Sequence, residues 1–268
     1  MDFLTRWIDR SATLRIASLD ATRACRTICL LHDLEGEPAR GFSQALCGAL
    51  LMASDFKNFE TFSLQLEISE TTYHVDATPE GLVRGLVAPR SHASTASHIQ
   101  GRRFGQKGLI YQSIVDALVQ EVGPALAAYV RQSDQQESHM DLVVDLDEGG
   151  LPSVAKGAWL RGFPDTKPQD LVQFIADWTG RGSAWDPAKP WADLPQALWD
   201  SLATLEPKAF CPCSEERALG ALSVLGRETI EEAQREGKEL EVVCDYCHSS
   251  YSLAAQTVLD AMDAKSQG

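Results

Sequence analysis

Four cysteines near the C-terminus constrain this chain more than any other feature of its sequence. They form two close pairs, Cys211 with Cys213 and Cys244 with Cys247, which a longer stretch of chain separates. Four thiolates at such spacings can surround one tetrahedral metal ion, and Zn2+ accepts four sulfur ligands. We therefore predict that these four cysteines hold one Zn2+ per chain.

The segment that carries the cysteines, residues 210–268, is small for a unit that must fold around its own core. A unit of roughly 60 residues buries too little apolar surface to be stable by that means alone. Structural zinc contributes about 10–16 kcal/mol of apparent binding free energy at neutral pH, and this becomes folding free energy when the metal-free form is loosely ordered. We therefore expect loss of the metal to unfold this segment.

The same thiols can leave the metal as disulfides, so the site can be a redox switch as well as a structural one. Oxidation removes the ligands, and with them the largest stabilising contribution to the segment. A disulfide between Cys211 and Cys213 would close a very tight ring, and its strain would make it easy to reduce again. The spacing thus favours a reversible switch, while a permanent structural site stays open.

The amino-acid composition restricts the cellular location of the protein and the kinds of partner that it can bind. Its 268 residues carry a formal net charge of -14, which repels phosphate backbones, so we predict no nucleic-acid partner. No apolar run approaches the roughly 20 residues that span a bilayer, and residues 1–10 have charges inside their apolar stretch, unlike a signal peptide. We therefore predict a cytoplasmic protein with no membrane partner, whose cysteines are metal ligands, redox centres or buried thiols.

The pattern of apolar residues predicts an α+β fold in three parts, of which residues 1–164 form a mixed α/β domain. The predicted helices of this domain cover residues 22–34, with Thr22 as a cap, 38–57 and 124–130. The predicted strands cover residues 62–68, 73–77, 81–87, 141–146 and 158–160. The apolar pattern of residues 109–115 fits the period of a helix and that of a strand equally well. We interpret the basic stretch 101–108 as a mobile loop that could hold an anion.

Residues 165–209 form the second part, an apolar connector that we expect to be helical and packed. One helix begins at Pro168 and ends at Gly180, and a second covers residues 194–205. The apolar stripe of the first helix consists of Leu171, Val172, Phe174, Ile175 and Trp178. This stripe can be ordinary core packing, or it can be a surface that is covered at rest and exposed on a signal.

Residues 210–268 form the third part, a small zinc-binding domain with two predicted helices and a hairpin. The helices cover residues 215–225 and 229–236, where Thr229 and Glu232 form a capping box and Gly237 ends the second helix. A strand over residues 240–243 leads into Cys244, and a returning strand begins near Tyr251. The second cysteine pair is therefore expected in the turn of a hairpin.

The remaining cysteines and histidines give weaker signals. Cys25, Cys29 and His32 lie on one predicted helical face, but their apolar neighbours favour buried, inert thiols there and at Cys47. His248 follows the last cysteine and could compete as a ligand, although four sulfurs already complete a tetrahedron. The motifs of the common enzyme classes do not occur in the sequence, so we predict that the protein is not an enzyme.

These residues resemble a known family, the thirty-three-kilodalton chaperonin, a redox-regulated heat-shock holdase of the bacterial cytosol. The resemblance rests on residues 210–217, Phe-Cys-Pro-Cys-Ser-Glu-Glu-Arg, and on residues 243–247, Val-Cys-Asp-Tyr-Cys, followed by Tyr251. Weaker similarity extends over nearly the full length and makes residues 109–115 a strand. The chain departs from the family in having His248 where glycine commonly follows the last cysteine, and Ser113 where glycine follows Tyr-Gln.

The resemblance implies an ATP-independent holdase that binds unfolding client proteins under oxidative stress. In the reduced state the protein is a zinc-bound, inactive monomer. Oxidant pairs Cys211 with Cys213 and Cys244 with Cys247, zinc leaves, and the C-terminal unit unfolds. The connector then loosens, and the protein tends to form a homodimer through residues 1–164. The candidate client contacts on the connector are Phe174, Ile175, Trp178 and Trp199.

Two other functions are compatible with the cysteine motif. A zinc-knuckle module could bind a nucleic acid or a protein partner, although acidic residues outnumber Lys and Arg in residues 210–268 and oppose binding to nucleic acid. A thiol–disulfide oxidoreductase that uses Cys244 and Cys247 would need a thiol at a helix N-terminus, whereas this motif follows a predicted strand. Salt-dependent binding of RNA or DNA would favour the first function, and turnover in insulin reduction the second.

Overall fold

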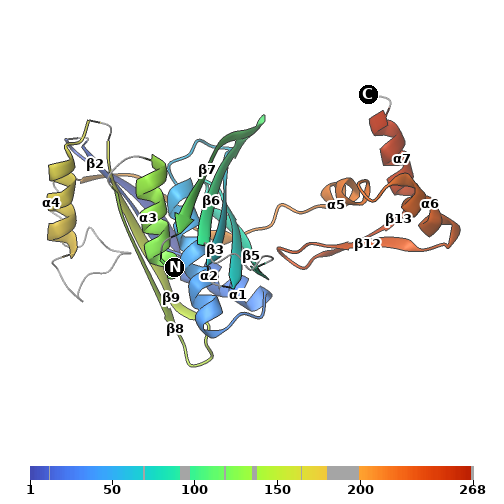
Figure 1. Ribbon diagram of the computed structural model, residues 1–268, viewed down its shortest axis with the longest axis horizontal. Coiled ribbons are helices and arrows are strands. Elements are labelled where there is room, and N and C mark those ends of the chain that lie inside the picture. The colour runs from blue at the N-terminus through green and yellow to red at the C-terminus, as the bar shows by residue number, and fades with distance from the viewer. Residues whose placement is uncertain are drawn as a thin grey trace. The chain divides into compact units, whose positions relative to one another are not determined.

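The computed structural model describes residues 1–11, 13–68, 70–90, 97–117, 119–134, 138–163, 165–179 and 199–266. The chain divides into two compact units, Met1–Phe210 and Cys211–Gly268 (Figure 1). Both units combine helices with antiparallel strands, which confirms the predicted α+β class. Among the described residues, no helix combines the length and the apolar character needed to cross a membrane.

Two β-sheets form the frame of the first unit (Figure 1). The five-stranded sheet has the order β10 (Trp199–Leu205), β1 (Phe3–Asp9), β2 (Leu14–Asp20), β9 (Pro152–Gly162) and β8 (Ser138–Leu146). The six-stranded sheet has the order β11 (Lys208–Ala209), β5 (Leu82–Pro89), β4 (Thr71–Ala77), β3 (Thr61–Ile68), β6 (Ser97–Gly105) and β7 (Gly108–Ala117). The short strand β11 pairs with β5 in parallel, whereas the strands within the five-stranded sheet are all antiparallel.

Helix α2, Gly36–Ala53, lies between the two sheets and forms the centre of the core (Figure 1). It contacts β8 and β9 of one sheet and β3, β4 and β5 of the other. Its sequence is apolar on nearly every side, and Phe42, Leu46 and Leu50 are fully buried. A helix of this kind is stable only where apolar elements surround it, so α2 holds the two sheets together.

Helix α1, Thr22–Leu31, is capped by a side chain from the start of the chain. The buried carboxylate of Asp2 accepts hydrogen bonds from the backbone N–H groups of Arg23, at 3.0 Å, and Ala24, at 2.8 Å. These groups have no partner within the helix, and a negative charge is favourable at this end. The predicted Thr22 cap is therefore wrong, and the Thr22 hydroxyl donates instead to Asp20, at 2.7 Å.

Most of the predicted strands of the first unit are confirmed. Residues 62–68, 73–77, 81–87 and 141–146 lie in β3, β4, β5 and β8, and residues 158–160 lie in β9, which pairs with β8. Residues 109–115 belong to β7. Strands β1 and β2 have no counterpart in the prediction. The basic stretch 101–108 is not a loop, because it forms the end of β6 and the tight turn into β7.

The helix predicted over residues 194–205 is wrong in its second half. Residues 199–205 form β10, which pairs with β1 from Leu4 opposite Leu205 to Asp9 opposite Trp199. A helix of this length is marginal without tertiary support, so hydrogen bonding to the open edge of β1 outweighs the local preference. The first half, residues 194–198, lies outside the described residues.

Helix α4, Pro168–Thr179, packs on the face of the five-stranded sheet opposite to α2. Alternate side chains of a strand point to opposite faces, and on β2 Leu14 and Ile16 face α4 whereas Leu19 faces α2. Leu171 of α4 is 2% exposed. It forms a small apolar cluster with Leu14, Ile16, Ala158, Leu160 and Trp199, against which Phe174 packs. The side chains of Ile175 and Trp178 lie outside the described residues.

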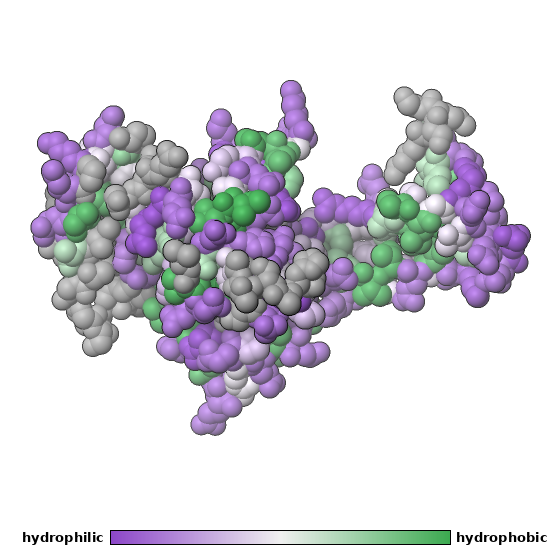
Figure 2. All heavy atoms as spheres, in the orientation of Figure 1, coloured by the Kyte–Doolittle hydropathy of each residue, from purple (hydrophilic) through white to green (hydrophobic). Residues whose placement is uncertain are grey.

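Exposed apolar side chains gather on β7, the edge strand of the six-stranded sheet. Leu109 and Ile110 are each 55% exposed and Ile114 is 59% exposed. The face of the molecule in Figure 2 is mostly hydrophilic, with separate hydrophobic patches. An exposed apolar edge strand is a site where another chain can pair, and this edge is open in the structure as described.

The described residues of the second unit form three helices and one hairpin, which Figure 1 draws in orange and red. The helices are α5 (Glu215–Leu222), α6 (Arg227–Arg235) and α7 (Ala255–Ser266), and the hairpin joins β12 (Glu239–Val243) to β13 (Ser250–Ala254). Ser214 caps α5 by accepting a hydrogen bond from the Arg217 N–H at 3.3 Å. The buried core is small: Ala218, Leu222, Ile230, Leu253, Ala255, Val258 and Leu259.

The predicted helices and hairpin of this unit are confirmed, with two differences. Helix α6 begins at Arg227 after Gly226 and has no side-chain cap, so the capping box at Thr229 is wrong. Helix α7 follows β13 directly and was not predicted. Gly237 lies beyond the end of α6 with φ 67°, a conformation that glycine adopts without strain, in agreement with its predicted role.

A substitution at Gly101 of β6 can test how closely this strand packs against α3, Val122–Asp134. A Cβ atom at Gly101 would lie 2.0 Å from the Tyr129 hydroxyl and 3.0 Å from the Phe62 ring. We expect Gly101→Ala to lower the free energy of unfolding by roughly 1–3 kcal/mol, because an overfilled core must shift its rings. Urea denaturation of the zinc-loaded protein, followed by circular dichroism, measures this.

Gly123→Ala is the matched control, because a Cβ atom there has no neighbour closer than 3.7 Å. It lies within α3, where alanine is favoured over glycine. Equal stability of the two variants would contradict the packing described for Tyr129.

Candidate metal centre

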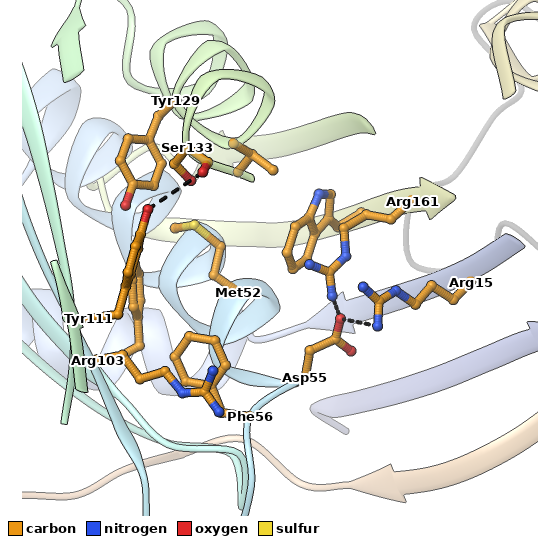
Figure 3. A pocket seen from close by; sticks show the side chains of 12 residues that line it. Arg15, Met52, Asp55, Phe56, Arg103, Tyr111, Tyr129, Ser133 and Arg161 are labelled. Atoms are coloured by element: carbon orange, nitrogen blue, oxygen red, sulfur yellow. Dashed lines mark hydrogen bonds and ion pairs between the residues drawn. The ribbon is translucent and has the colours of Figure 1, made fainter. Parts of the chain in front are cut away.

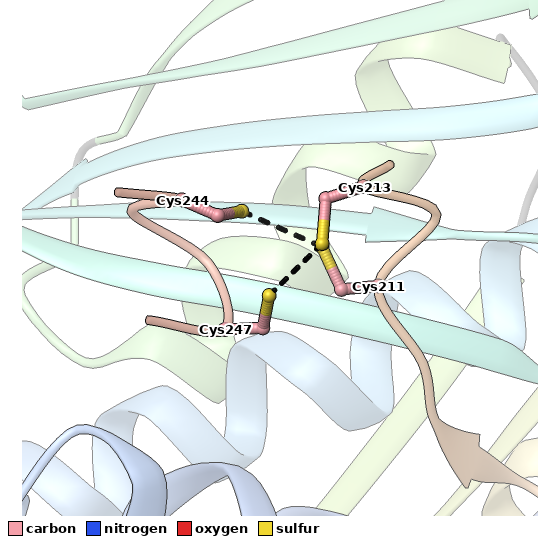
Figure 4. Close-up of side chains that lie close together, drawn as sticks. All are labelled: Cys211, Cys213, Cys244 and Cys247. Carbon is pink, nitrogen blue, oxygen red and sulfur yellow. Dashed lines mark hydrogen bonds between the residues drawn. The ribbon is translucent and has the colours of Figure 1, made fainter. Parts of the chain in front are cut away.

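Four cysteine sulfurs meet between two parts of the second unit (Figure 4). Cys211 and Cys213 lie on the segment before α5, and Cys244 and Cys247 lie in the turn between β12 and β13. All four Sγ atoms lie within 4.8 Å of one another. Two contacts join one pair to the other: Cys211 Sγ lies 3.6 Å from Cys244 Sγ, and Cys213 Sγ lies 3.1 Å from Cys247 Sγ. Each of the four is half-buried.

Backbone hydrogen bonds in the hairpin turn orient the second pair. The Cys244 N–H donates to the Ser249 carbonyl at 2.9 Å, and the His248 N–H donates to the Cys244 carbonyl at 2.8 Å. This turn places Cys244 and Cys247 on the same side. It requires His248 to adopt φ 56°, in the left-handed region, where a non-glycine residue is uncommon. A glycine would adopt this φ freely.

Hydroxyl groups surround two of the sulfurs. The Tyr251 hydroxyl of β13 donates to Cys213 Sγ at 3.1 Å. This hydrogen bond raises the pKa of Tyr251 to about 12, so the phenol remains a donor. The Ser249 hydroxyl lies 3.3 Å from Cys247 Sγ, where it can donate to the thiolate. Burial raises the pKa of Cys247, but hydrogen bonds from Ser249 and the neighbouring cysteines outweigh it and lower that pKa to about 6.

The residues present fit a tetrahedral Zn2+ site. Thiolates are the ligands that Zn2+ takes in closed structural sites, and Cys247 is ionised at neutral pH without help from a metal. The surrounding hydroxyls serve as donors that stabilise negative sulfur and orient the ligands. Among the described residues, no histidine or carboxylate joins the cluster, and His248 is not part of it. The predicted cysteines therefore lie together, with the ligand number and chemistry that zinc requires.

The other three cysteines are buried, as the sequence predicts. Cys25, Cys29 and Cys47 are inaccessible to solvent, and Cys25 Sγ lies 3.9 Å from Cys47 Sγ. The hydrogen bond to Cys47 and burial raise the pKa of Cys25, and burial raises that of Cys29 to about 11. His32 packs edge-on against Phe42, with ring centroids 6.1 Å apart. All three cysteines are core residues, and the raised pKa values of Cys25 and Cys29 keep those two thiols protonated at neutral pH.

The two hydroxyl donors were not predicted from the sequence. Tyr251 was noted as the start of a strand, and Ser249 carried no signal by itself. Their positions follow from the hairpin register, in which Val243 pairs with Ser250 and Val242 with Tyr251. The sequence signal that could have identified these two donors is a pair of hydroxyl residues, one two positions and one four positions after the last cysteine of the hairpin.

The lowered pKa of Cys247 predicts how the site responds to acid. A thiol with a lowered pKa contributes stability that is complete above its ordinary pKa and is lost as the pH falls through about 6. Ser249→Ala removes a donor to the thiolate, so protons compete better with the metal and zinc should leave at higher pH. We expect roughly a tenfold loss of zinc affinity, the size usual for such donors. A chromogenic chelator titration from pH 8 down to pH 4 measures this.

Ser252→Ala is the matched control on the same strand, because Ser252 donates to the exposed Glu239 carboxylate at 2.5 Å and not to a sulfur. An identical release curve for the Ser249 and Ser252 variants would show that the hydroxyl does not support the thiolate.

The chain is similar over nearly its whole length to several known proteins. The family model described as Hsp33 protein matches residues 2–254. A 33 kDa chaperonin of Pelobacter propionicus is 30% identical over 280 residues, covering 95% of this chain and 91% of the relative. A 33 kDa chaperonin of Aquifex aeolicus is 24% identical, covering 93% of this chain and 86% of the relative. The crystal structure of a 33 kDa chaperonin from Thermotoga maritima has the same fold, with TM-score 0.78, 21% identity, and coverage of 100% of this chain and 99% of that one.

Proposed function

Because the chain belongs to the Hsp33 family and is therefore a chaperone, we propose that it is an ATP-independent holdase of the cytoplasm, activated by oxidation. The observation that carries this proposal is the cluster of four cysteine sulfurs within 4.8 Å, in a unit whose remaining core is small. In the proposed cycle the reduced protein is inactive, and oxidative stress converts it to a form that binds unfolding proteins.

In the reduced state, the four ligands of one Zn2+ are Cys211, Cys213, Cys244 and Cys247. When bound, the ion would link the segment before α5 to the hairpin turn and compensate thiolate charge. Tyr251 holds Cys213 by its hydrogen bond, and Ser249 supports Cys247. The small core contributes little stability by itself, so the fold of residues 211–266 depends on these four thiolates.

Oxidation converts the ligands to disulfides. A peroxide accepts two electrons and two protons from each pair of thiols, giving one disulfide and reduced oxygen as water. We propose the pairs Cys211–Cys213 and Cys244–Cys247, following the family resemblance. Sulfurs of the crossed pairs Cys211–Cys244 and Cys213–Cys247 are also in contact in the structure, so peptide mapping of the oxidised protein is needed to distinguish the two patterns. Either pattern removes the donor set that zinc requires.

The loss of the C-terminal fold reaches the connector through its last strand. Strand β11 is two residues long, and the Phe210 N–H, one residue before Cys211, donates to the Val83 carbonyl at 2.9 Å. A strand this short is weakly held. Unfolding that begins at Cys211 therefore acts on the most easily released element of the first unit, after which β10 and α4 follow.

The apolar side chains beneath the connector are the proposed client contacts. Trp199 is 7% exposed, and its ring packs against that of Phe174 with centroids 5.8 Å apart. We propose that Phe174, Ile175, Trp178 and Trp199 bind clients once α4 and β10 loosen. The exposed residues on β7 are accessible without any change, so they do not account for activation.

The three parts of the chain have distinct proposed roles. Residues 1–164 are proposed to bind clients and to form the homodimer of the oxidised state. Residues 165–209 act as the releasable connector and add the client contacts named above, and residues 210–268 act as the switch. The reduced form is proposed to be a monomer. Partners are unfolded proteins and not nucleic acids, because the net charge of -14 opposes binding to phosphate backbones.

The first test compares zinc content, free thiols and activity before and after oxidation. Peroxide with mild heating should release one Zn2+ per chain, consume the four cluster thiols and suppress aggregation of a model client in light scattering. Cys29→Ser is the control, because that thiol is buried and outside the cluster, and it should keep the switch. Equal suppression by the reduced, zinc-loaded protein would contradict regulation by oxidation.

The second test opens the connector without oxidation. Leu171→Ala leaves a cavity beneath α4 and should cost about 2–5 kcal/mol of local stability. We expect limited proteolysis to cut α4 faster and the reduced protein to gain part of the holdase activity. Val172→Ala is the matched control on the same helix, because Val172 is 56% exposed. A connector that opens to protease without any gain in activity would show that clients bind elsewhere.

A further inference from the structure

Two buried thiols of the first unit lie in contact with each other and belong to different helices. Cys25 of α1 and Cys47 of α2 are both fully buried, and their Sγ atoms lie 3.9 Å apart. The sulfurs of a disulfide lie about 2 Å apart, so side-chain rotation and a small shift of the two helices would join them. The proposed holdase cycle uses neither thiol.

The third buried thiol of this core provides an internal comparison. Cys29 lies one turn after Cys25 on α1 and is equally buried. Its Sγ atom lies 3.7 Å from the Ser43 hydroxyl and 3.9 Å from the Ala39 carbonyl, both on α2. The contact between sulfurs therefore favours Cys25 over Cys29 as the partner of Cys47.

The pair is protected from oxidants in the structure as it stands. The thiolate is the form of cysteine that reacts, and both the hydrogen bond to Cys47 and burial raise the pKa of Cys25. Neither sulfur is accessible to solvent. Oxidation of this pair therefore requires α1 to open locally.

Helix α1 is held by elements that the connector would release. Strand β11 packs against α1 and ends two residues before Cys211. The residue that caps α1, Asp2, directly precedes β1. The same end of β1 pairs with β10, with Leu4 opposite Leu205. Release of β11 and β10 would thus remove a neighbour of α1 and one partner of the strand that follows its cap.

We propose that Cys25 and Cys47 are a second redox pair, which forms a disulfide after the connector has been released and ties α1 to α2. The order of these events rests on the proposed function, whereas the pairing rests on the contact between the sulfurs. One thiol first reacts with a peroxide to give a sulfenic acid and water. The second thiol then attacks the sulfenic sulfur, the S–S bond forms, and the hydroxyl leaves as a second water.

The disulfide would stabilise the first unit in the state in which its last elements are lost. It closes the chain between residues 25 and 47 and so restricts the unfolded state. Helix α2 lies in the centre of the large core, so a covalent bond to it would keep α1 in place. Oxidation would then have opposite effects on the two units, because it unfolds the second and fixes the core of the first.

The test uses the full chain with serine at all four cluster positions, which leaves Cys25, Cys29 and Cys47. This variant is incubated with peroxide at mild heat, denatured, alkylated and digested with trypsin without reduction. The three cysteines lie on separate tryptic peptides, because trypsin cleaves after Arg26 and Arg40. We expect peptides 24–26 and 41–57 to be linked through Cys25 and Cys47, and Cys29 to be alkylated. The absence of this link, or a link through Cys29, would overturn the proposed pair.

The crosslink should also raise the midpoint of thermal unfolding of this variant by about 5–10 °C, measured by circular dichroism, and a reductant should reverse the shift. Cys47→Ala in the same background should lose both the link and the shift. Cys29→Ala is the matched control, because Cys29 is equally buried on α1, and it should keep both. A shift that persists in the Cys47 variant would contradict the assignment.

A time course with the unmodified chain tests the order of events. Peroxide should first release zinc and consume the four cluster thiols, and the link between Cys25 and Cys47 should appear later. A link that precedes zinc release would overturn the control by the connector. Zinc release and holdase activity that are never followed by the link would overturn this inference and leave the proposed function intact.

Discussion

The C-terminal unit of this protein depends on the convergence of four sulfur atoms. Two sulfurs come from the segment before α5 and two from the turn of the β12–β13 hairpin, so the cluster joins segments that are far apart in sequence. The apolar core beside it is a single small group of side chains. The proposed metal ion would be the largest stabilising contribution to a unit of this size. The proposal therefore makes the fold of the unit depend on whether the four thiolates are available as ligands.

The first unit has a different source of stability. Helix α2 is buried between two sheets, and a large continuous core surrounds it. The last elements of this unit along the chain are held less firmly: α4 and β10 cover one small apolar cluster, and β11 is very short. Since β11 ends just before Cys211, the weakest elements of the stable unit adjoin the unit that depends on metal. Because of this order along the chain, unfolding that follows oxidation of the cluster thiols would spread first to β11, β10 and α4, and would expose the apolar surface that they cover.

Features set by local sequence could be predicted, and features set by distant partners could not. The cysteine cluster follows from spacing within two short motifs, and the burial of α2 follows from a helical sequence that is apolar on nearly every side. The Asp2 cap of α1, by contrast, comes from the start of the chain and displaces the Thr22 cap. Strand β10 exists because the edge of β1 is open to it.

The same distinction applies within the sites. The Tyr251 hydroxyl reaches Cys213 only through the hairpin register. Arg15, Asp55 and Arg161 line a cavity of the first unit, where Asp55 pairs with both arginines (Figure 3). These residues are far apart in sequence and meet only when β2, the end of α2 and β9 pack together. No pattern of spacing could have indicated that cavity.

The most direct test of the central claim is amide hydrogen exchange of the reduced protein before and after removal of zinc by a chelator, without any oxidant. The account predicts that amides of residues 211–266 lose protection together, while those of α2 and the two sheets keep it. Persistent protection of the C-terminal unit in the reduced, zinc-free protein would contradict the claim that its fold depends on the four thiolates and their metal.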